Sequence, residues 1–211
     1  MLKKELIKNY KWIIFFICLI IFLALTEDVF NHEIMKGDII GYKIVSKYLI
    51  QSSLTPIIKV ITNFGSAAFL IFLTIILFII IKDKKIGILI GTNLILITIL
   101  NQILKFIFQR PRPSEFMIIK EFGYSFPSGH SMVGMAFYGL LIYLIYKKIK
   151  NKSLKVLLII LLSFLILMIG ISRIYLGVHY TSDVLAGFVI SIAYLILYIN
   201  VSKKIICNFN K

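Results

Sequence analysis

Residues 154–172 read LKVLLIILLSFLILMIGIS, an apolar run with one lysine near its start and Arg173 directly after its end. A helix needs about 20 mostly apolar residues to cross the roughly 30 Å hydrocarbon core of a bilayer, so this run predicts a transmembrane helix. Other apolar runs of suitable or nearly suitable length lie at 12–26, 56–81, 86–108, 129–147 and 182–201. The sequence therefore predicts an all-α, polytopic membrane protein with six transmembrane helices.

The composition indicates the same class of protein. Of the 211 residues, 60% are hydrophobic and only 16% are charged, and the mean hydropathy is +0.97. In a soluble domain about a quarter of the residues are charged. The runs leave no length for a sizeable soluble domain, so we expect a single membrane-embedded domain over residues 1–211.

The net charge of +15 comes largely from basic clusters at the ends of the apolar runs. This placement is typical of topology signals and of contacts with anionic headgroups, and it argues against nucleic acid as a partner. Clusters at 3–11, 82–85, 147–155 and 203–211 fall on one side of the predicted bundle, which the positive-inside rule makes cytoplasmic. We therefore expect a multi-pass protein of the cell (inner) membrane with both termini in the cytoplasm.

Two segments near the N-terminus each allow more than one interpretation. The run at 12–26 is short enough for a signal peptide, but LALTED (23–28) is a poor small-x-small cleavage site, so we expect an uncleaved signal anchor. The segment 27–55 fits a helix lying in the membrane interface, anchored by Tyr42 and Tyr48, and fits an ordinary extracytoplasmic loop equally well. The sequence leaves these two alternatives open.

Cations also gather on the opposite, extracytoplasmic side, where topology gives no reason for them. They fall in or beside three stretches that face the same compartment: KFIFQRPRP (105–113), YSFPSGHS (124–131) and SRIYLGVHYTSD (172–183). These stretches predict an active site at the extracytoplasmic end of the bundle. The side chains brought to this depth are Lys105, Arg112, Ser128, His130, Arg173, His179 and Asp183.

The PSGH stretch suits the entry of a membrane helix. Pro127 is tolerated where a helix begins, Ser128 can cap the helix, and Gly129 lets an anion approach the backbone closely. A helix N-terminus presents free N–H groups and the positive end of the helix dipole, which together form an anion site. We expect His130 to project from the first turn over an anion held there.

His179 and Asp183 are four residues apart, so on a helix that starts near 179 they share a face and can hydrogen-bond. The carboxylate would fix the tautomer of the imidazole and make its other nitrogen more nucleophilic. Arg173 supplies a planar donor fork suited to phosphate. Lys105 ends an apolar run where a charge is costly without a partner, so we expect Lys105 and Arg112 to clamp an anion.

The remaining charges of the outer face are expected to take no part in chemistry. Arg110 and Lys120 are weaker candidates, for which we expect a solvated or headgroup-facing role. The outer carboxylates other than Asp183 show no paired spacing that would hold Mg²⁺, so we expect neither a metal nor another cofactor. Three fixed cations can replace the metal, which predicts activity in the presence of a chelator.

In these motifs the chain resembles the type 2 phosphatidic acid phosphatase superfamily of integral-membrane lipid phosphatases. The signature of that family has three parts, K-x6-RP, PSGH and SR-x5-H-x3-D. They are matched in this order by Lys105–Pro113, Pro127–His130 and Ser172–Asp183. The motif core covers about 105–183, and no motif position departs from the pattern.

The resemblance implies a role for each residue. His179 would attack phosphorus and form a phosphohistidine, and Asp183 would orient it. His130 would protonate the leaving oxygen and then activate the water that hydrolyses the intermediate. The phosphate would be bound by Lys105, Arg112, Ser128, Gly129 and Arg173.

The depth of the site favours a lipid phosphate over a sugar phosphate, because the phosphate must reach the headgroup level while the tail stays in the bilayer. Family and topology favour undecaprenyl pyrophosphate, with phosphatidylglycerophosphate and phosphatidic acid as alternatives. A lipid phosphotransferase of the same fold also stays open. A transporter is disfavoured, because the ionisable residues gather at one end of the bundle and not at the bilayer midplane.

Overall fold

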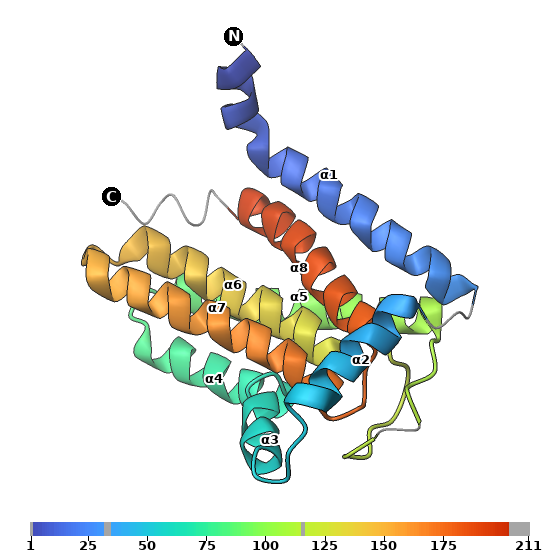
Figure 1. The fold of residues 1–211 in the computed structure, drawn as a ribbon. Helices are drawn as coiled ribbons and strands as arrows, with labels where there is room; N and C mark the ends of the chain where they lie inside the picture. The colour runs from blue at the N-terminus through green and yellow to red at the C-terminus, as the bar shows by residue number, and fades with distance from the viewer. Residues whose placement is uncertain (1, 32–34, 115–116, 203–211) are drawn as a thin grey trace.

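The structure is a computed structural model that describes residues 2–31, 35–114 and 117–202. Within these residues all regular secondary structure is helical (Figure 1). The helices are α1 (Leu2–Phe30), α2 (Lys36–Tyr48), α3 (Thr55–Asn63), α4 (Ala67–Ile80), α5 (Lys84–Phe108), α6 (Gly129–Lys148), α7 (Lys152–Tyr175) and α8 (Thr181–Val201). Among them, α1, α5, α6, α7 and α8 are long and apolar enough to cross a membrane, and the bent pair of α3 and α4 passes the same test when it is taken as one span. The prediction of an all-α membrane protein is confirmed, with five spans, or six when the bent pair is counted as one.

The apolar run 56–81 was predicted to form one continuous helix. In the structure it is divided into α3 and α4, which are bent by 51° relative to each other. The hydroxyl of Ser66 begins α4, because it accepts a hydrogen bond from the N–H of Phe69 at 3.3 Å. A serine N-cap directly after Gly65 is a local signal for a new helix, and the apolar residues on both sides masked it.

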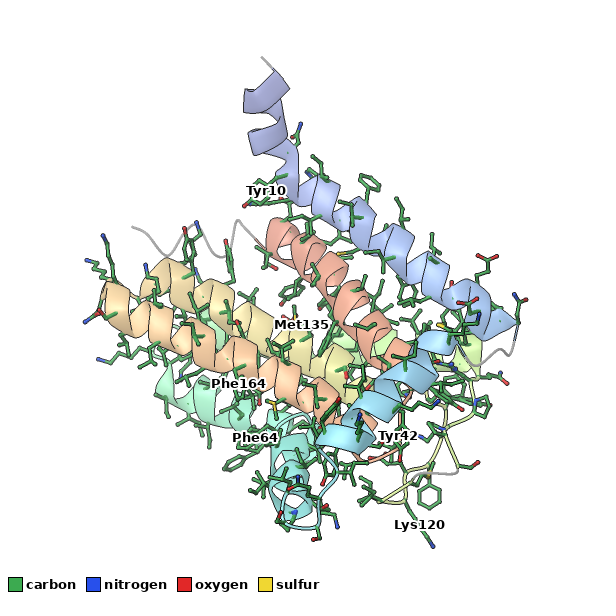
Figure 2. The ribbon with its side chains drawn as sticks, viewed as in Figure 1. Tyr10, Tyr42, Phe64, Lys120, Met135 and Phe164 are labelled. Carbon is green, nitrogen blue, oxygen red and sulfur yellow. The ribbon has the colours of Figure 1, made fainter. Side chains whose placement is uncertain are left out.

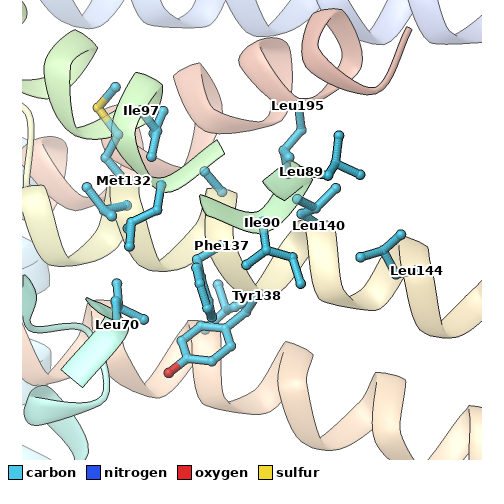
Figure 3. Packing of buried hydrophobic residues seen from close by; sticks show 14 of the residues in the cluster. Leu70, Leu89, Ile90, Ile97, Met132, Phe137, Tyr138, Leu140, Leu144 and Leu195 are labelled. Carbon is cyan, nitrogen blue, oxygen red and sulfur yellow. The ribbon is translucent and has the colours of Figure 1, made fainter. Parts of the chain in front are cut away.

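The hydrophobic core is built around α6, which packs against α5, α7 and α8 (Figure 1). Met132, Phe137 and Leu140 of α6 lie in one buried cluster with Leu89 and Ile97 of α5 (Figure 3). Burying such side chains contributes about 1.5–3 kcal/mol each when they leave water. In a bilayer this gain is made mainly on insertion, so close packing of the buried side chains holds the helices together.

The outer surface of the bundle is as apolar as its core. Along α7 the side chains of Ile160, Phe164 and Leu167 are more than half exposed. A soluble protein rarely presents a continuous apolar surface of this kind to water. It is the surface that a membrane-spanning helix presents to lipid.

Two helices of the N-terminal region reach the bundle from outside. α1 lies along α8 (Figure 1), and its Phe22 and Val29 belong to one buried cluster with Phe126. α2 forms within the segment 27–55, so the segment contains a helix, and its placement in the membrane interface stays a prediction. It contacts the ends of α7 and α8 (Figure 1) and buries Asp38.

Candidate active site

The predicted site residues lie at the same end of the bundle. Lys105 is in the last turn of α5, Ser128 is the N-cap of α6, Arg173 is in the last turn of α7 and Asp183 is in the first turn of α8. The first turn of α6 also lies very close to α8. A Cβ on Gly187 would lie 3.1 Å from the backbone oxygen of Ser128, so glycine is needed where these two helices meet.

The predicted pair of His179 and Asp183 is formed. Nδ1 of His179 lies 3.3 Å from Oδ2 of Asp183, and the same oxygen accepts the backbone N–H of Tyr180 at 2.9 Å. The sequence placed His179 on a helix that starts near residue 179. In the structure His179 lies in the turn that precedes α8. Asp183 is fully buried and His179 is 4% exposed, so the bond between them is shielded from water.

The second ring nitrogen of His179 faces a cation. Nη1 of Arg112 lies 3.1 Å from Nε2, a contact in which Nε2 accepts and Nδ1 carries the proton that Asp183 binds. Burial, together with the positive charges of Arg173, Arg112 and Lys105, lowers the pKa of His179 well below its ordinary value. The imidazole is therefore neutral at neutral pH, and Nε2 carries the lone pair that a nucleophile needs.

Arg173 is almost fully buried, with 1% of its surface exposed. Its Nη1 donates to Oγ1 of Thr62 at 2.7 Å, and its Nη2 donates to Oε1 of Glu121 at 2.6 Å. Its Nε has no hydrogen-bond partner among the residues that the structure describes. The guanidinium is thus fixed in orientation while one N–H donor stays uncommitted, which suits an anion-binding residue.

Arg112 and Lys105 are both tied to the loop that joins α5 to α6. Nζ of Lys105 donates to the backbone oxygen of Tyr124. The guanidinium of Arg112 donates to the backbone oxygens of Phe122, Gly123 and Val178 at 3.1, 3.0 and 2.9 Å. Because carbonyl oxygens are neutral, these bonds orient the two cations and leave their charge available to an anion.

The start of α6 departs from expectation at Ser128. The residue is the N-cap, but its side chain caps no backbone N–H; its hydroxyl instead accepts a hydrogen bond from Oγ of Ser131 at 3.0 Å. The prediction that the Ser128 side chain caps the helix is therefore wrong. The backbone N–H groups of the first turn are left to donate to another acceptor. Gly129 lies beside Lys105, since a Cβ on Gly129 would be 4.0 Å from Cε of Lys105 and 3.2 Å from Oδ1 of Asn101.

His130 lies in the first turn of α6, against the bend between α3 and α4. A Cβ on Gly65 would lie 3.2 Å from Cδ2 of His130, so the absence of a side chain at the bend makes room for the imidazole. The same bend places Thr62 on Arg173. The break in the second span, which the sequence analysis missed, is therefore part of the site. Figure 2 labels Phe64, which lies at this bend between α3 and α4.

Arg110 is the main correction to the sequence analysis. We expected it to be solvated or to face headgroups, but it is 5% exposed and bound to the carboxylates of Asp38 and Asp183 at 2.8 and 2.7 Å. The reason lies in Gln109, whose left-handed backbone (φ 45°) ends α5 and redirects the chain. Lys120, by contrast, is exposed as expected, on the loop beyond the bundle (Figure 2).

Sequence reasoning also missed three uncharged or acidic neighbours of the predicted cations. Thr62 and Glu121 bind Arg173, and Nδ2 of Asn101 donates to the backbone oxygen of Pro127 at 3.2 Å. Asn101 and Thr62 each interrupt an apolar membrane run, and a polar residue there is rare unless it has a partner. That signal was present in the sequence. Glu121 had no comparable signal.

Glu121 contacts two of the cations that the sequence predicts to bind phosphate. Its Oε1 is 2.6 Å from Arg173 and its Oε2 is 3.8 Å from Arg112, so one carboxylate spans two of the predicted anion-binding cations. We expect Glu121→Gln to bind vanadate more tightly, because the variant removes a negative charge that competes for the same donors. For a pair that is partly exposed the gain is about 1 kcal/mol, or roughly fivefold in the inhibition constant.

The inhibition constant for vanadate is the quantity to measure. Lys120→Gln is the matched control, since it changes the charge of the neighbouring, exposed residue and is expected to leave vanadate binding unchanged. Weaker vanadate binding by Glu121→Gln would mean that the carboxylate holds the arginines in place and does not compete with the anion.

A cavity of about 560 Å³ opens beside this cluster, between α2, residues 113–114 and the turn before α8. Its wall includes His179 but none of the predicted phosphate-binding residues. The cavity is therefore a neighbour of the anion-binding residues and not the space that they surround.

Within the described residues, no group of three or more His, Cys, Asp or Glu side chains is placed to hold a metal ion. Independence from metal stays a prediction.

The sequence model of the PAP2 superfamily matches residues 86–207, a range that contains all three motifs. The chain belongs to the PAP2 superfamily. This confirms the resemblance inferred from the motifs. The chain is also 31% identical to phosphatidylglycerophosphatase B of Bacillus subtilis (strain 168) over 195 residues, which is 87% of this chain and 92% of that protein.

Two solved structures resemble this fold. One is a transmembrane PAP2-type phosphatidylglycerolphosphate phosphatase from Bacillus subtilis, with a TM-score of 0.79 and 29% identity, covering 89% of this chain and 95% of that one. The other is LpxE from Aquifex aeolicus, with a TM-score of 0.63 and 25% identity, covering 75% and 92%. The protein is thus a PAP2 lipid phosphatase of the membrane, as the sequence predicted.

Proposed function

We propose that this PAP2 enzyme hydrolyses phosphatidylglycerophosphate to phosphatidylglycerol and inorganic phosphate at the extracytoplasmic face. The observation that carries the reaction type is a buried histidine that is held by a carboxylate at Nδ1 and meets a cation at Nε2, at the ends of membrane helices. The choice of lipid is supported by the Bacillus subtilis relatives, whose names give this activity. The outward orientation is supported by the basic clusters of the predicted cytoplasmic segments.

The proposed reaction has two displacements at phosphorus. The N–H of Arg112 turns from Nε2 of His179 to a phosphoryl oxygen, Nε2 attacks, the P–N bond forms and the P–O bond to the glycerol headgroup breaks. The proton that the departing alkoxide needs comes from His130. Water then attacks the phosphohistidine, gives its proton to His130, and restores both histidines with release of phosphate. Asp183 keeps the proton of Nδ1 in place and stabilises the positive imidazole ring of the intermediate.

Charge stabilisation is assigned to the cations around His179. Arg173, Arg112 and Lys105 would bind the phosphoryl oxygens, with the backbone N–H of Gly129 and the hydroxyl of Ser128. In phosphoryl transfer most of the catalytic effect comes from positioning and from electrostatic stabilisation, so three fixed cations can do work that Mg²⁺ does elsewhere. Activity should therefore survive EDTA.

The test compares the activity of the purified, detergent-solubilised enzyme on different lipids, with EDTA present. Phosphatidylglycerophosphate, phosphatidic acid and undecaprenyl pyrophosphate are offered separately, and both phosphate release and lipid consumption are measured. We expect phosphatidylglycerophosphate to have the highest kcat/KM. Family and topology favoured undecaprenyl pyrophosphate, and a higher kcat/KM for that lipid would overturn the proposed substrate while keeping the reaction.

The same measurement separates hydrolysis from phosphoryl transfer to another alcohol. A hydrolase releases one inorganic phosphate for each lipid molecule that it dephosphorylates. Phosphate release well below lipid consumption would show that the phosphoryl group passes to an acceptor other than water. Loss of activity in EDTA, restored by Mg²⁺, would contradict the role given to the three cations.

A further inference from the structure

Arg110 joins two carboxylates that come from different helices. Its Nη1 donates to Oδ1 of Asp183 at 2.7 Å, and its Nη2 donates to Oδ2 of Asp38 at 2.8 Å. The guanidinium also lies over the ring of Tyr180, 4.1 Å from its centroid. A planar fork held in this way fixes both carboxylates in angle as well as in distance.

Asp38 is the link from α2 to the start of α8. It is 3% exposed, its Oδ1 accepts the backbone N–H of Ser182 at 2.8 Å, and its Oδ2 accepts the hydroxyl of Ser182 at 2.9 Å. A carboxylate at this position satisfies one of the backbone N–H groups that lack an intrahelical partner at the N-terminus of α8. Removing one member of such a buried network leaves the others without partners, so its geometry is strongly determined.

Asp183 is thereby held by both of its oxygens. Oδ1 faces Arg110, while Oδ2 accepts from Tyr180 and faces Nδ1 of His179. If Arg110 or Asp38 moved, the carboxylate could turn about its side-chain bonds and the imidazole would lose its fixed direction. We propose that α2, acting through Asp38 and Arg110, is the positioning element that fixes the Asp183–His179 pair for attack. This inference rests on the proposed role of that pair.

The contact between α2 and α8 depends on one glycine. A Cβ on Gly41 would lie 2.1 Å from Oγ1 and 3.0 Å from Cβ of Thr181, so alanine requires the side chain of Thr181 to rotate and the contact between α2 and α8 to widen. Gly37 is on the same helix, one turn earlier, and a Cβ there would meet nothing within 4 Å. Figure 1 shows α2 crossing the bundle close to where α8 begins. The two glycines therefore form a matched pair for an experiment.

The test compares Gly41→Ala with Gly37→Ala in the purified enzyme. For phosphatidylglycerophosphate we expect Gly41→Ala to lower kcat about 10- to 100-fold with KM changed little, the range found when supporting residues of a site are lost. Gly37→Ala is expected to keep the wild-type kcat. Neither variant removes a polar group, so the difference between them reports the displacement of α2.

Two further readouts separate positioning from loss of folding. Affinity for vanadate, which mimics the five-coordinate transition state, is expected to fall with kcat in Gly41→Ala, while inhibition by inorganic phosphate changes little; an unfolded site would lose both. In an Asp183→Asn background, Gly41→Ala is expected to cause no further loss, because α2 acts through Asp183.

Asp38→Asn provides a second route to the same question, since it keeps the volume of the side chain and removes its charge. We expect it to lower kcat by about tenfold with little change in KM. Equal kcat in Gly41→Ala, Gly37→Ala and wild type would overturn the inference, and so would a full additional loss in the Asp183→Asn background. Absence of phosphate release by the wild type would instead reject the proposed function.

Discussion

Replacing His179 with alanine is expected to lower phosphate release by roughly 10⁴- to 10⁶-fold, the largest effect of any single change in this protein. The variant lacks the nitrogen that forms the bond to phosphorus, whereas the cations that would bind the substrate are unchanged. The measurement is kcat for phosphatidylglycerophosphate, together with trapping of enzyme-bound ³²P. The wild type should carry a label that is stable to alkali and labile to acid, and His179→Ala should carry none.

Asp183→Asn is the companion variant that tests how the pair works. The amide keeps the shape of the side chain but places a donor or a weaker acceptor against Nδ1, so we expect a loss of about 10²- to 10⁴-fold. Since Asp183 acts on His179, the double variant should be no slower than His179→Ala alone. An acid-labile label on His179→Ala, or appreciable phosphate release by it, would assign the nucleophile to another residue. An unchanged thermal unfolding temperature excludes a general loss of structure.

The membrane fold was predictable because lipid imposes length and hydrophobicity on each span. Four runs in the sequence correspond closely to α5, α6, α7 and α8, and α1 extends further than the run at 12–26 indicated. The bend between α3 and α4 was missed because hydropathy averages over a window in which two polar residues, Asn63 and Ser66, have little weight. Capping is a property of single residues, so it is lost in such an average.

The candidate site was predictable where a motif fixes the spacing and unpredictable where contacts join distant segments. His179 and Asp183 could be paired from their separation of four residues. The bonds of Arg110 to Asp38 and of Arg173 to Thr62 span 72 and 111 positions in the chain, and no local pattern encodes them. The solvent exposure of Arg110 was also predicted wrongly. As a cation next to a helix end it was expected to face water or headgroups, yet two buried carboxylates are its partners.

His130→Ala is also expected to produce a large loss of activity, and the size of that loss should depend on the leaving group. For phosphatidylglycerophosphate the departing alkoxide is strongly basic and needs a proton, so we expect kcat to fall about 10²- to 10⁴-fold. For p-nitrophenyl phosphate the departing phenolate is weakly basic and can leave without help. The first displacement should then stay fast while the second, which also uses His130, becomes slow.

This combination predicts a burst with p-nitrophenyl phosphate. His130→Ala should release about one equivalent of p-nitrophenol per enzyme rapidly and then turn over slowly, with labelled phosphohistidine accumulating at His179. The ring of His130 lies against Gly65 at the bend, and alanine leaves space there without a clash, so the site should otherwise keep its geometry. Equal losses with both substrates and no burst would make His130 a phosphate-binding residue, because a missing binding contact slows both displacements whatever the basicity of the leaving group.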